Sequence, residues 1–165
     1  MAMADDEGLG EVRALPRRPD RGFATFYAET QPEMVRVATL LVGLPDVALD
    51  LVQDCYVRIH DRWDRIDDPP AYLRRSVANA CHSHHRRQRR LRALRLRPAE
   101  PIGLDADELG DALAALPDRQ RQAVVLRFYA GLPDADIAAA LGCRVGTVAS
   151  LIHRGLAALR EVIEP

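Results

Sequence analysis

Apolar residues recur every three or four positions along most of the chain, which is the spacing of side chains on one face of an α-helix. Between Gly22 and Val42 this spacing predicts one long helix or two short ones, because Pro32 can start a helix at its first turn. A second helix is predicted from about Val47 to Trp63, and a third begins near Pro70 and runs into an arginine-rich segment. No stretch alternates as a strand does, so the predicted fold is all-α.

Glycine, proline and aspartate interrupt this pattern and divide the chain. The run from Gly43 to Asp46 predicts the end of one helix and the start of the next, with Asp46 as its cap. From 92 to 110 the periodicity disappears among Arg, Pro, Ala, Glu and Gly, which is typical of a linker. Such a linker would reach at most roughly 60 Å at about 3.3 Å per residue. We predict a mobile tail at 1–20, a helical domain at 21–91, a flexible linker at 92–110 and a second helical domain at 111–165.

The segment from Asp134 to Val148 has the pattern of a helix-turn-helix. Small alanines in its first helix permit close packing, and Gly142 supplies the backbone freedom of a tight turn. Thr147 then begins a helix whose first residues would face base edges in a DNA groove. An ordinary hairpin of two helices is the alternative, since alanine-rich helices joined at glycine are common in bundles. The positions of the apolar residues favour DNA binding.

The net charge of −1 hides a strongly uneven distribution. All 23 basic residues are arginine, and residues 71–97 contain nine of them without one acidic residue. Four arginines, Arg86, Arg87, Arg89 and Arg90, occupy about one and a half turns of the third predicted helix. Like charges this close repel one another unless a polyanion lies near, and the phosphate backbone of a nucleic acid is the expected partner.

Other features exclude several classes of protein. The three cysteines are odd in number and far apart, which favours reduced thiols in a cytosolic protein over a disulfide framework. The N-terminus is acidic, and no apolar run approaches the roughly 18 residues of a membrane span. We therefore expect a soluble, cytoplasmic protein that makes no membrane contact. No nucleophile–base pair, phosphate-binding loop or carboxylate pair is present, so we expect neither enzymatic activity nor a cofactor.

The cluster from Cys81 to His85 raises the possibility of a metal site. Thiolate and imidazole suit zinc, but the pair Cys81 and His85 gives only two ligands where a structural site needs four. We expect no metal there, and we expect the histidines to be additional DNA contacts or a solvated helix face. A metal-binding helical adaptor remains an alternative interpretation.

The run from Leu113 to Arg160 resembles the fourth conserved region of extracytoplasmic-function (ECF) sigma factors of the sigma-70 family, of the actinobacterial SigE-like type. It reads LAALPDRQRQAVVLRFYAGLPDADIAAALGCRVGTVASLIHRGLAALR. In that family the region binds the −35 promoter element. The resemblance implies DNA contacts by Arg144, Thr147, Val148, Ser150, His153 and Arg154. Ala149 and Leu151 replace residues that are commonly basic in the family, which predicts weaker contact at the −35 side.

The stretch from Leu49 to Arg58, followed by Trp63, is similar to the second conserved region of the same family. There the polar face of a helix docks on the β′ clamp helices of RNA polymerase, and the next segment binds the −10 element. A solvated acidic face is the alternative for this helix, and core packing is the alternative for Trp63 and Tyr72. The implied polymerase contacts are Asp50, Gln53, Asp54 and Arg58. The implied −10 contacts are Trp63, Tyr72, Arg74, Arg75, Asn79, Arg86, Arg87, Arg89 and Arg90.

Together these similarities imply an RNA polymerase sigma factor that recognises promoters. Its expected partners are core RNA polymerase, through the β′ clamp helices and the β flap, and promoter DNA. An anti-sigma factor is a further partner that the resemblance allows. A stand-alone helix-turn-helix regulator is the competing interpretation, but it leaves the helix from Asp50 to Arg58 unexplained.

Overall fold

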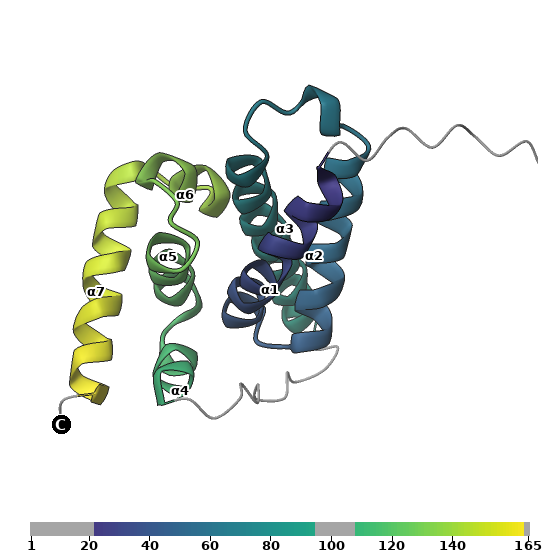
Figure 1. Ribbon diagram of the computed structural model, residues 1–165. Helices are drawn as coiled ribbons and strands as arrows, with labels where there is room; N and C mark the ends of the chain where they lie inside the picture. The colour runs from purple at the N-terminus through teal and green to yellow at the C-terminus, as the bar shows by residue number, and fades with distance from the viewer. Residues whose placement is uncertain (1–21, 95–107, 164–165) are drawn as a thin grey trace, which may run out of the picture.

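A computed structural model describes residues 22–94 and 108–163 of the chain. In these residues the chain forms α-helices and one 3-10 turn, without a strand, which confirms the predicted all-α fold (Figure 1). The predicted tail and most of the predicted linker lie outside the described residues. The elements are α1 (Phe23–Val42), α2 (Pro45–His60), η1 (Trp63–Arg65), α3 (Pro69–Ala93), α4 (Glu108–Ala115), α5 (Asp118–Phe128), α6 (Asp134–Leu141) and α7 (Val145–Ile163).

The first helical segment forms a single helix, with Pro32 inside α1. This resolves the choice between one helix and two. The helix ends where the backbone N–H of Gly43 donates to the carbonyl of Thr39 at 2.7 Å. The prediction that Asp46 caps the next helix was wrong. The cap position is Leu44, Pro45 is the first helical residue, and Asp46 lies inside the first turn, because the fixed φ of proline suits that first position.

The second helix is shorter than predicted, and the third runs into the arginine-rich segment as predicted. Helix α2 ends at His60, and Trp63 begins the separate 3-10 turn η1. Helix α3 then starts at Pro69, where the carboxylate of Asp68 accepts a hydrogen bond from the backbone N–H of Ala71 at 3.0 Å. This is the usual role of an aspartate before a helix. Helix α3 continues to Ala93 and so carries the arginine-rich segment on regular helical backbone.

Aromatic rings and hydrogen bonds join α1 to α2 in the N-terminal half. Trp63 packs edge-on against Phe23, with ring centroids 5.3 Å apart, and lies 5.1 Å from Phe26. The hydroxyl of Tyr56 donates to Thr30 at 2.6 Å, because the Thr30 hydroxyl is itself a donor to the Phe26 carbonyl. The rest of this core is aliphatic. Its fully buried side chains include Leu41, Val52, Cys55, Ile59, Leu73 and Val77.

The C-terminal half is built from aliphatic residues and closely packed helices. Helix α5 packs on α7, and a Cβ atom added at Gly155 would lie 2.8 Å from Cγ2 of Val124. Glycine at this position therefore permits the approach of the two helices. The regular spacing of apolar residues extends through this half and would place three further side chains in the core, but they lie at the surface. These are Leu109, Phe128 and Leu156.

The two halves pack directly against each other. Helix α6 lies along α3, and α5 lies against α1, so that helices from both ends of the chain stand side by side (Figure 1). The buried residues of both halves join in one hydrophobic cluster. In the described part of the chain, no single helix is long and apolar enough to cross a membrane. The consecutive pair α6 and α7 reaches that threshold only when taken together, and the two are bent by 95°.

Candidate nucleic-acid interface

The outer face of α2 presents charged side chains to solvent. Asp50, Asp54 and Arg58 are exposed. Gln53 is half-buried, because its side-chain amide donates a hydrogen bond of 2.7 Å to the hydroxyl of Tyr27 on α1. The four residues predicted to bind the polymerase therefore lie on one side of α2, with Gln53 at the edge toward α1. Asp54 and Arg58 lie at the opposite edge, toward α3.

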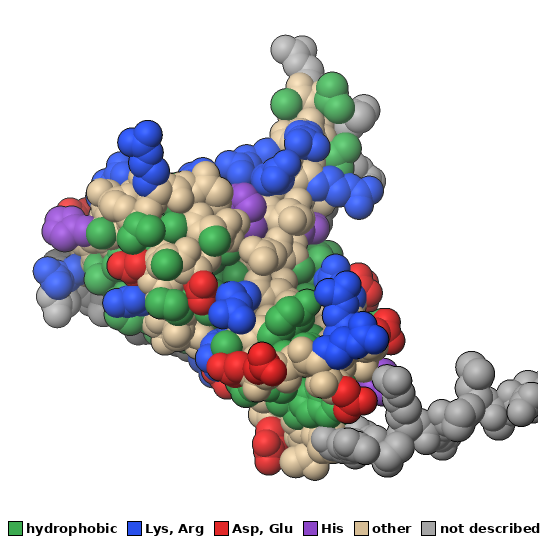
Figure 2. Space-filling model, turned by 90° about the horizontal axis from the view of Figure 1, so that it is seen from above, with side chains coloured by type: hydrophobic (Ala, Val, Ile, Leu, Met, Phe, Trp, Pro, Cys, Tyr) green, Lys and Arg blue, Asp and Glu red, His purple; other side chains and the backbone are tan. Residues whose placement is uncertain are grey.

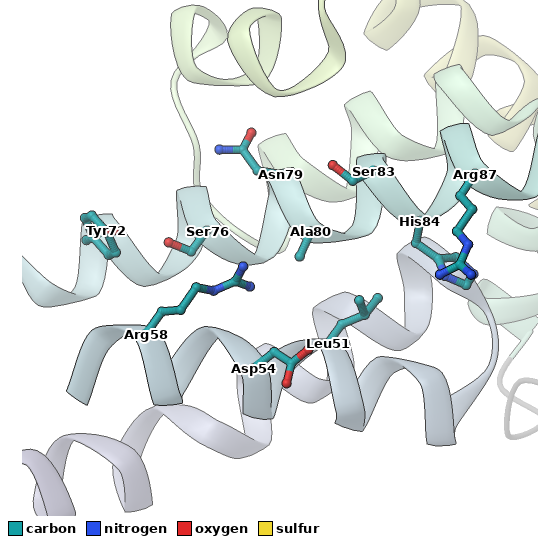
Figure 3. Close-up of a pocket in the computed structure, with 10 residues that line it drawn as sticks. All are labelled: Leu51, Asp54, Arg58, Tyr72, Ser76, Asn79, Ala80, Ser83, His84 and Arg87. Atoms are coloured by element: carbon teal, nitrogen blue, oxygen red, sulfur yellow. The ribbon is translucent and has the colours of Figure 1, made fainter. Parts of the chain in front are cut away.

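A groove of about 500 Å3 separates this edge of α2 from α3. In Figure 3 the Arg58 side chain reaches from α2 toward α3, and Asp54 lies one turn earlier on the same helix. At the far end of the groove the Arg87 side chain lies beside His84, whereas Asn79 points away from α2. Burial, with a smaller contribution from Arg87, lowers the pKa of His84. The remaining lining residues are Leu51, Tyr72, Ser76, Ala80 and Ser83.

The residues predicted to contact the −10 element occupy different environments. Trp63 and Tyr72 are half-buried and pack against the core, so core packing accounts for both rings. Asn79 and Arg75 are exposed. Arg75 faces α6, where its guanidinium lies 3.6 Å from the carboxylate of Asp136. Arg74 is half-buried, and its Nε has no hydrogen-bond partner in the structure.

The last turns of α3 carry a dense group of exposed arginines. Figure 2 shows arginine side chains crowding the projecting part of the surface that leads into the undescribed residues. In the described part of the chain, none of these arginines forms an ion pair within 4 Å, so their charges remain available to a polyanion. They are Arg86, Arg87, Arg89, Arg90 and Arg92.

Helices α6 and α7 form the predicted helix-turn-helix. Their axes turn by 95° at a short connection in which Gly142 adopts a left-handed conformation with φ of 60°. This angle falls within the range of the motif. The side chains of Ala149, Ser150, His153 and Arg154 line a shallow hollow on the exposed face of α7. Arg144 and Thr147 are exposed at the start of that helix.

Two residues at the start of α7 do not have the environment that the sequence suggested. Val148 is fully buried, so its inclusion among the DNA contacts was wrong, and its side chain belongs to the core. Leu151 is 6% exposed and also faces inward. A basic residue at 151 would therefore point into the core of this chain, and only the exposed Ala149 marks a missing cationic contact.

The histidine cluster on α3 serves packing within the protein. The Nε2 of His85 donates to the carbonyl of Leu41 at 2.7 Å, and Nδ1 of His82 lies 3.3 Å from Oε1 of Gln122 on α5. Burial is the main cause that lowers the pKa of both histidines. Cys81 is 1% exposed, and burial raises its pKa far above that of a free thiol. The prediction of DNA contacts or a solvated face was therefore wrong for His82 and His85.

No three metal-binding side chains come together in residues 22–94 and 108–163. Sequence reasoning also missed two residues that the structure brings to the α3 surface. Asp136 and Gln122 contact α3 from the C-terminal half, but nothing in the sequence places them there, because they lie at least 40 positions from their partners.

Comparison with known proteins assigns both halves to one family. The family described as Sigma-70 region 2 matches residues 26–91, and Sigma-70, region 4 matches residues 106–159. The RNA polymerase sigma-E factor of Streptomyces avermitilis is 37% identical over 153 residues, which cover 86% of this chain and 85% of that protein. The ECF RNA polymerase sigma factor EcfG of Rhodopseudomonas palustris is 31% identical over 80% of each chain. This chain belongs to the ECF sigma factors.

The solved structure of a sigma factor shares the fold of this one. The sigma factor RpoE of Bartonella quintana, solved in complex with the anti-sigma factor NepR, has a TM-score of 0.66 and 27% identity. The match covers 86% of this chain and 96% of that one. As an RNA polymerase sigma factor, the protein directs transcription initiation together with core RNA polymerase and promoter DNA. In this sigma factor α1–α3 form region 2, and α4–α7 form region 4 with its helix-turn-helix.

Proposed function

We propose that this sigma factor divides its contacts among three surfaces. The outer face of α2 docks on the β′ clamp helices, the exposed residues of α3 bind the −10 element, and the start of α7 binds the −35 element. The observation that carries this division is the separation of unpaired cations into two groups, one at the end of α3 and one on α7. Two such groups suit two separate stretches of a phosphate backbone.

The protein acts in this proposal as a cytoplasmic specificity subunit without catalysis of its own. Five residues at the start of α7 or just before it would contact the −35 duplex, and three of them line the exposed hollow. Ser150 donates to the Gly146 carbonyl at 3.3 Å, and Arg154 Nε donates to the Ser150 carbonyl at 3.2 Å. The terminal nitrogens of Arg154 remain available for phosphate or a base edge. The other three −35 contacts are Arg144, Thr147 and His153.

An anti-sigma partner forms part of the proposal. The Bartonella quintana RpoE structure is a complex of a sigma factor with the anti-sigma factor NepR. The structure of CnrH, whose 24% identity shows the fold alone, is a complex with the cytosolic domain of CnrY. Such a partner would act here by covering one of the three surfaces. Covering the exposed acidic face of α2 would prevent the protein from binding polymerase.

Run-off transcription with purified core polymerase on genomic fragments tests the promoter contact. We expect Arg154→Ala to lower promoter-specific transcript several-fold and to leave core binding unchanged, because one phosphate or base contact is lost. Arg160→Ala is the matched control, since Arg160 is exposed in the last turn of the same helix. Equal losses for both variants would contradict the assignment of the α7 hollow.

Binding to core polymerase tests the α2 surface separately. We expect Asp54→Ala to weaken core binding by roughly tenfold, about 1.4 kcal/mol, since a charged contact at the edge of the groove is removed. Asp111→Ala is the control, because it removes an exposed carboxylate from α4, away from α2. Unchanged core affinity for Asp54→Ala, or equal binding of duplex promoter DNA without polymerase, would contradict the proposal.

A gain-of-function change tests the weak −35 contact that the sequence predicts. Ala149 is exposed in the α7 hollow, so Ala149→Lys should add a phosphate contact and steepen the dependence of log affinity on log salt by about 0.9. Ala157→Lys places the same charge on an exposed position two turns later. An equal change of slope in both variants would show only a general effect of charge.

A further inference from the structure

The groove between α2 and α3 offers both apolar and hydrogen-bonding surface. Leu51 and Ala80 contribute aliphatic side chains to its lining, and half-buried Tyr72 lines it where α3 begins. Ser76 and Ser83 add hydroxyl groups on the α3 side. The groove has a volume of about 500 Å3, which lies within the usual range of ligand sites. These surfaces suit a flat ring that also carries hydrogen-bonding groups, such as a nucleotide base.

Two arginines face this groove from opposite helices. Arg58 reaches from α2 toward α3, and Arg87 lies beside His84 at the other end (Figure 3). In the described part of the chain, neither guanidinium forms an ion pair within 4 Å, although Asp54 lies one turn from Arg58 on the same helix. Both charges therefore remain available to an anion in the groove.

A contact inside the protein orients the Arg58 guanidinium over the groove. Its Nη2 donates to Sγ of Cys55 at 3.6 Å, and the Cys55 side chain is fully buried. Sulfur is a weak acceptor, so this contact orients the guanidinium without neutralising its charge. The Arg58 side chain therefore extends toward α3, whereas Gln53 bonds to Tyr27 at the opposite edge of α2.

The other titratable groups leave the groove net positive. Among the described residues that line it, Asp54 is the only acid and His84 is the only base besides the two arginines. Burial, with a smaller contribution from Arg87, lowers the pKa of His84, so this ring is neutral at pH 7. Asp54 lies between Arg58 and Arg87 along the groove (Figure 3). Anionic groups are therefore favoured at the two ends and disfavoured in the middle.

The dimensions of the groove favour a strand of nucleic acid over a compact anion. From Tyr72 to Arg87 the α3 helix rises by roughly 22 Å, at about 1.5 Å per residue. Neighbouring helices pack roughly 8–10 Å apart, which leaves room between them for a single strand but not for a duplex. Beyond Arg87 the same helix carries the exposed Arg89 and Arg90. A strand that leaves the groove at this end therefore meets further cations.

We propose that the groove between α2 and α3 binds single-stranded DNA, with one phosphate held by Arg58 and another by Arg87. Bases of the strand lie against Leu51, Ala80 and the ring of Tyr72. Arg58 then contacts DNA instead of the polymerase, so the two edges of α2 serve different partners. This site deepens the proposed function and rests on it, because the displaced strand of an opened promoter is the single strand that it would bind.

Fluorescence anisotropy with a labelled single strand of random sequence tests the groove on the full chain without polymerase. We expect Arg58→Ala and Arg87→Ala each to weaken binding several-fold and to flatten the dependence of log affinity on log salt by about 0.7, since each removes one phosphate contact. Arg36→Ala is the matched control, because Arg36 is exposed on α1 and does not line the groove. Equal losses in all three variants, or no binding by wild type at low salt, would overturn the strand site.

Three further measurements identify the ligand and the chemistry of Arg58. Arg58→Lys keeps the cation and should recover most of the salt dependence that Arg58→Ala loses. A duplex of the same sequence should bind wild type and Arg58→Ala equally, and a matching loss with duplex would overturn the preference for a single strand. Deoxynucleoside 5′-monophosphates should not displace the labelled strand at an equal concentration of nucleotide. Displacement by them would show a site for free nucleotides instead of a strand.

Binding to core polymerase separates this site from the α2 docking surface. We expect Arg58→Ala to bind core polymerase as wild type does, whereas Asp54→Ala binds it more weakly. Lost core affinity with intact DNA affinity in Arg58→Ala would place Arg58 on the polymerase surface and overturn the strand site, while the proposed function would stand. Unchanged core affinity in Asp54→Ala would contradict the docking surface, and the anisotropy measurements, made without polymerase, would still decide the groove.

Discussion

Region 2 and region 4 solve the same packing problem by different means. Region 2 joins α1 to α2 with interlocking rings around Phe23 and Trp63 and with hydroxyl hydrogen bonds to Thr30 and Tyr27. Region 4 relies on aliphatic side chains and on the close approach of α5 and α7 at Gly155, while its Phe128 stays 59% exposed. The first region should therefore be sensitive to loss of volume, and the second to gain of volume.

The largest effect is expected from removal of a ring in region 2. Trp63→Ala deletes a side chain that contacts both Phe23 and Phe26, and we expect it to lower the free energy of unfolding by about 3 kcal/mol. Phe128→Ala removes a ring of region 4 that is exposed and should change stability by less than about 0.5 kcal/mol. Chemical denaturation monitored by circular dichroism measures both, and similar losses would show that the contrast between the regions is wrong.

An added methyl group should lower the stability of region 4 more than its size suggests. Gly155→Ala places a Cβ 2.8 Å from Val124 Cγ2, and we expect a loss of about 2 kcal/mol from the resulting strain. Gly146→Ala is made on the same helix, where a Cβ meets nothing within 4 Å, and should be neutral or stabilising because alanine favours helix. Thermal unfolding measures both variants, and equal melting temperatures would contradict the close approach of α5 and α7 at Gly155.

A single hydroxyl tests the hydrogen bonds of region 2. Tyr56→Phe removes the 2.6 Å bond to Thr30 and should cost about 1 kcal/mol of unfolding free energy, since a net hydrogen bond contributes roughly that amount. Tyr129→Phe in region 4 removes a hydroxyl for which the described part of the chain shows no hydrogen bond, and we expect no loss. Urea titrations compare the free energies of unfolding of the two variants. A loss of stability in Tyr129→Phe alone would contradict the expected difference between the regions.

The smallest effect concerns the contact between the regions, which should weaken in acid. Burial is the main cause that lowers the pKa of His82; the Gln122 bond opposes it, and Arg89, Arg119 and Arg86 reinforce it. When the two regions separate, the pKa of His82 returns toward about 6.5. The separated form therefore takes up a proton as the pH falls below that value, and the contact between the regions is weakened. Above that pH both forms are neutral and the effect vanishes.

Scattering of the intact chain at stepwise lower pH measures this change as an increase in radius of gyration. We expect a flatter profile for His82→Gln, which cannot take up the proton, and an unchanged profile for His153→Gln, whose side chain is exposed on α7. A radius of gyration independent of pH in wild type would show that protonation of His82 is not coupled to separation of the two regions.

Local patterns in the sequence were sufficient for the helices and for the helix-turn-helix. Regular spacing of apolar residues predicts an amphipathic helix because that spacing alone determines which side chains share a face. Gly142 likewise marks the turn through its own backbone freedom, with φ of 60°. The helix ends were less certain. Asp46 looked like a cap, yet Pro45 begins α2, because both residue types favour adjacent positions at a helix start.

Contacts between distant residues were decided only by the tertiary structure. The sequence alone determined an all-α chain, two family regions and a set of polar and arginine-rich candidates. Packing decided that Val148 and Leu151 face the core, that His82 and His85 are used inside the protein, and that Asp136 meets Arg75. The reason is physical: a helical repeat defines a face, but only the neighbouring helices determine whether that face meets water, DNA or the rest of the protein.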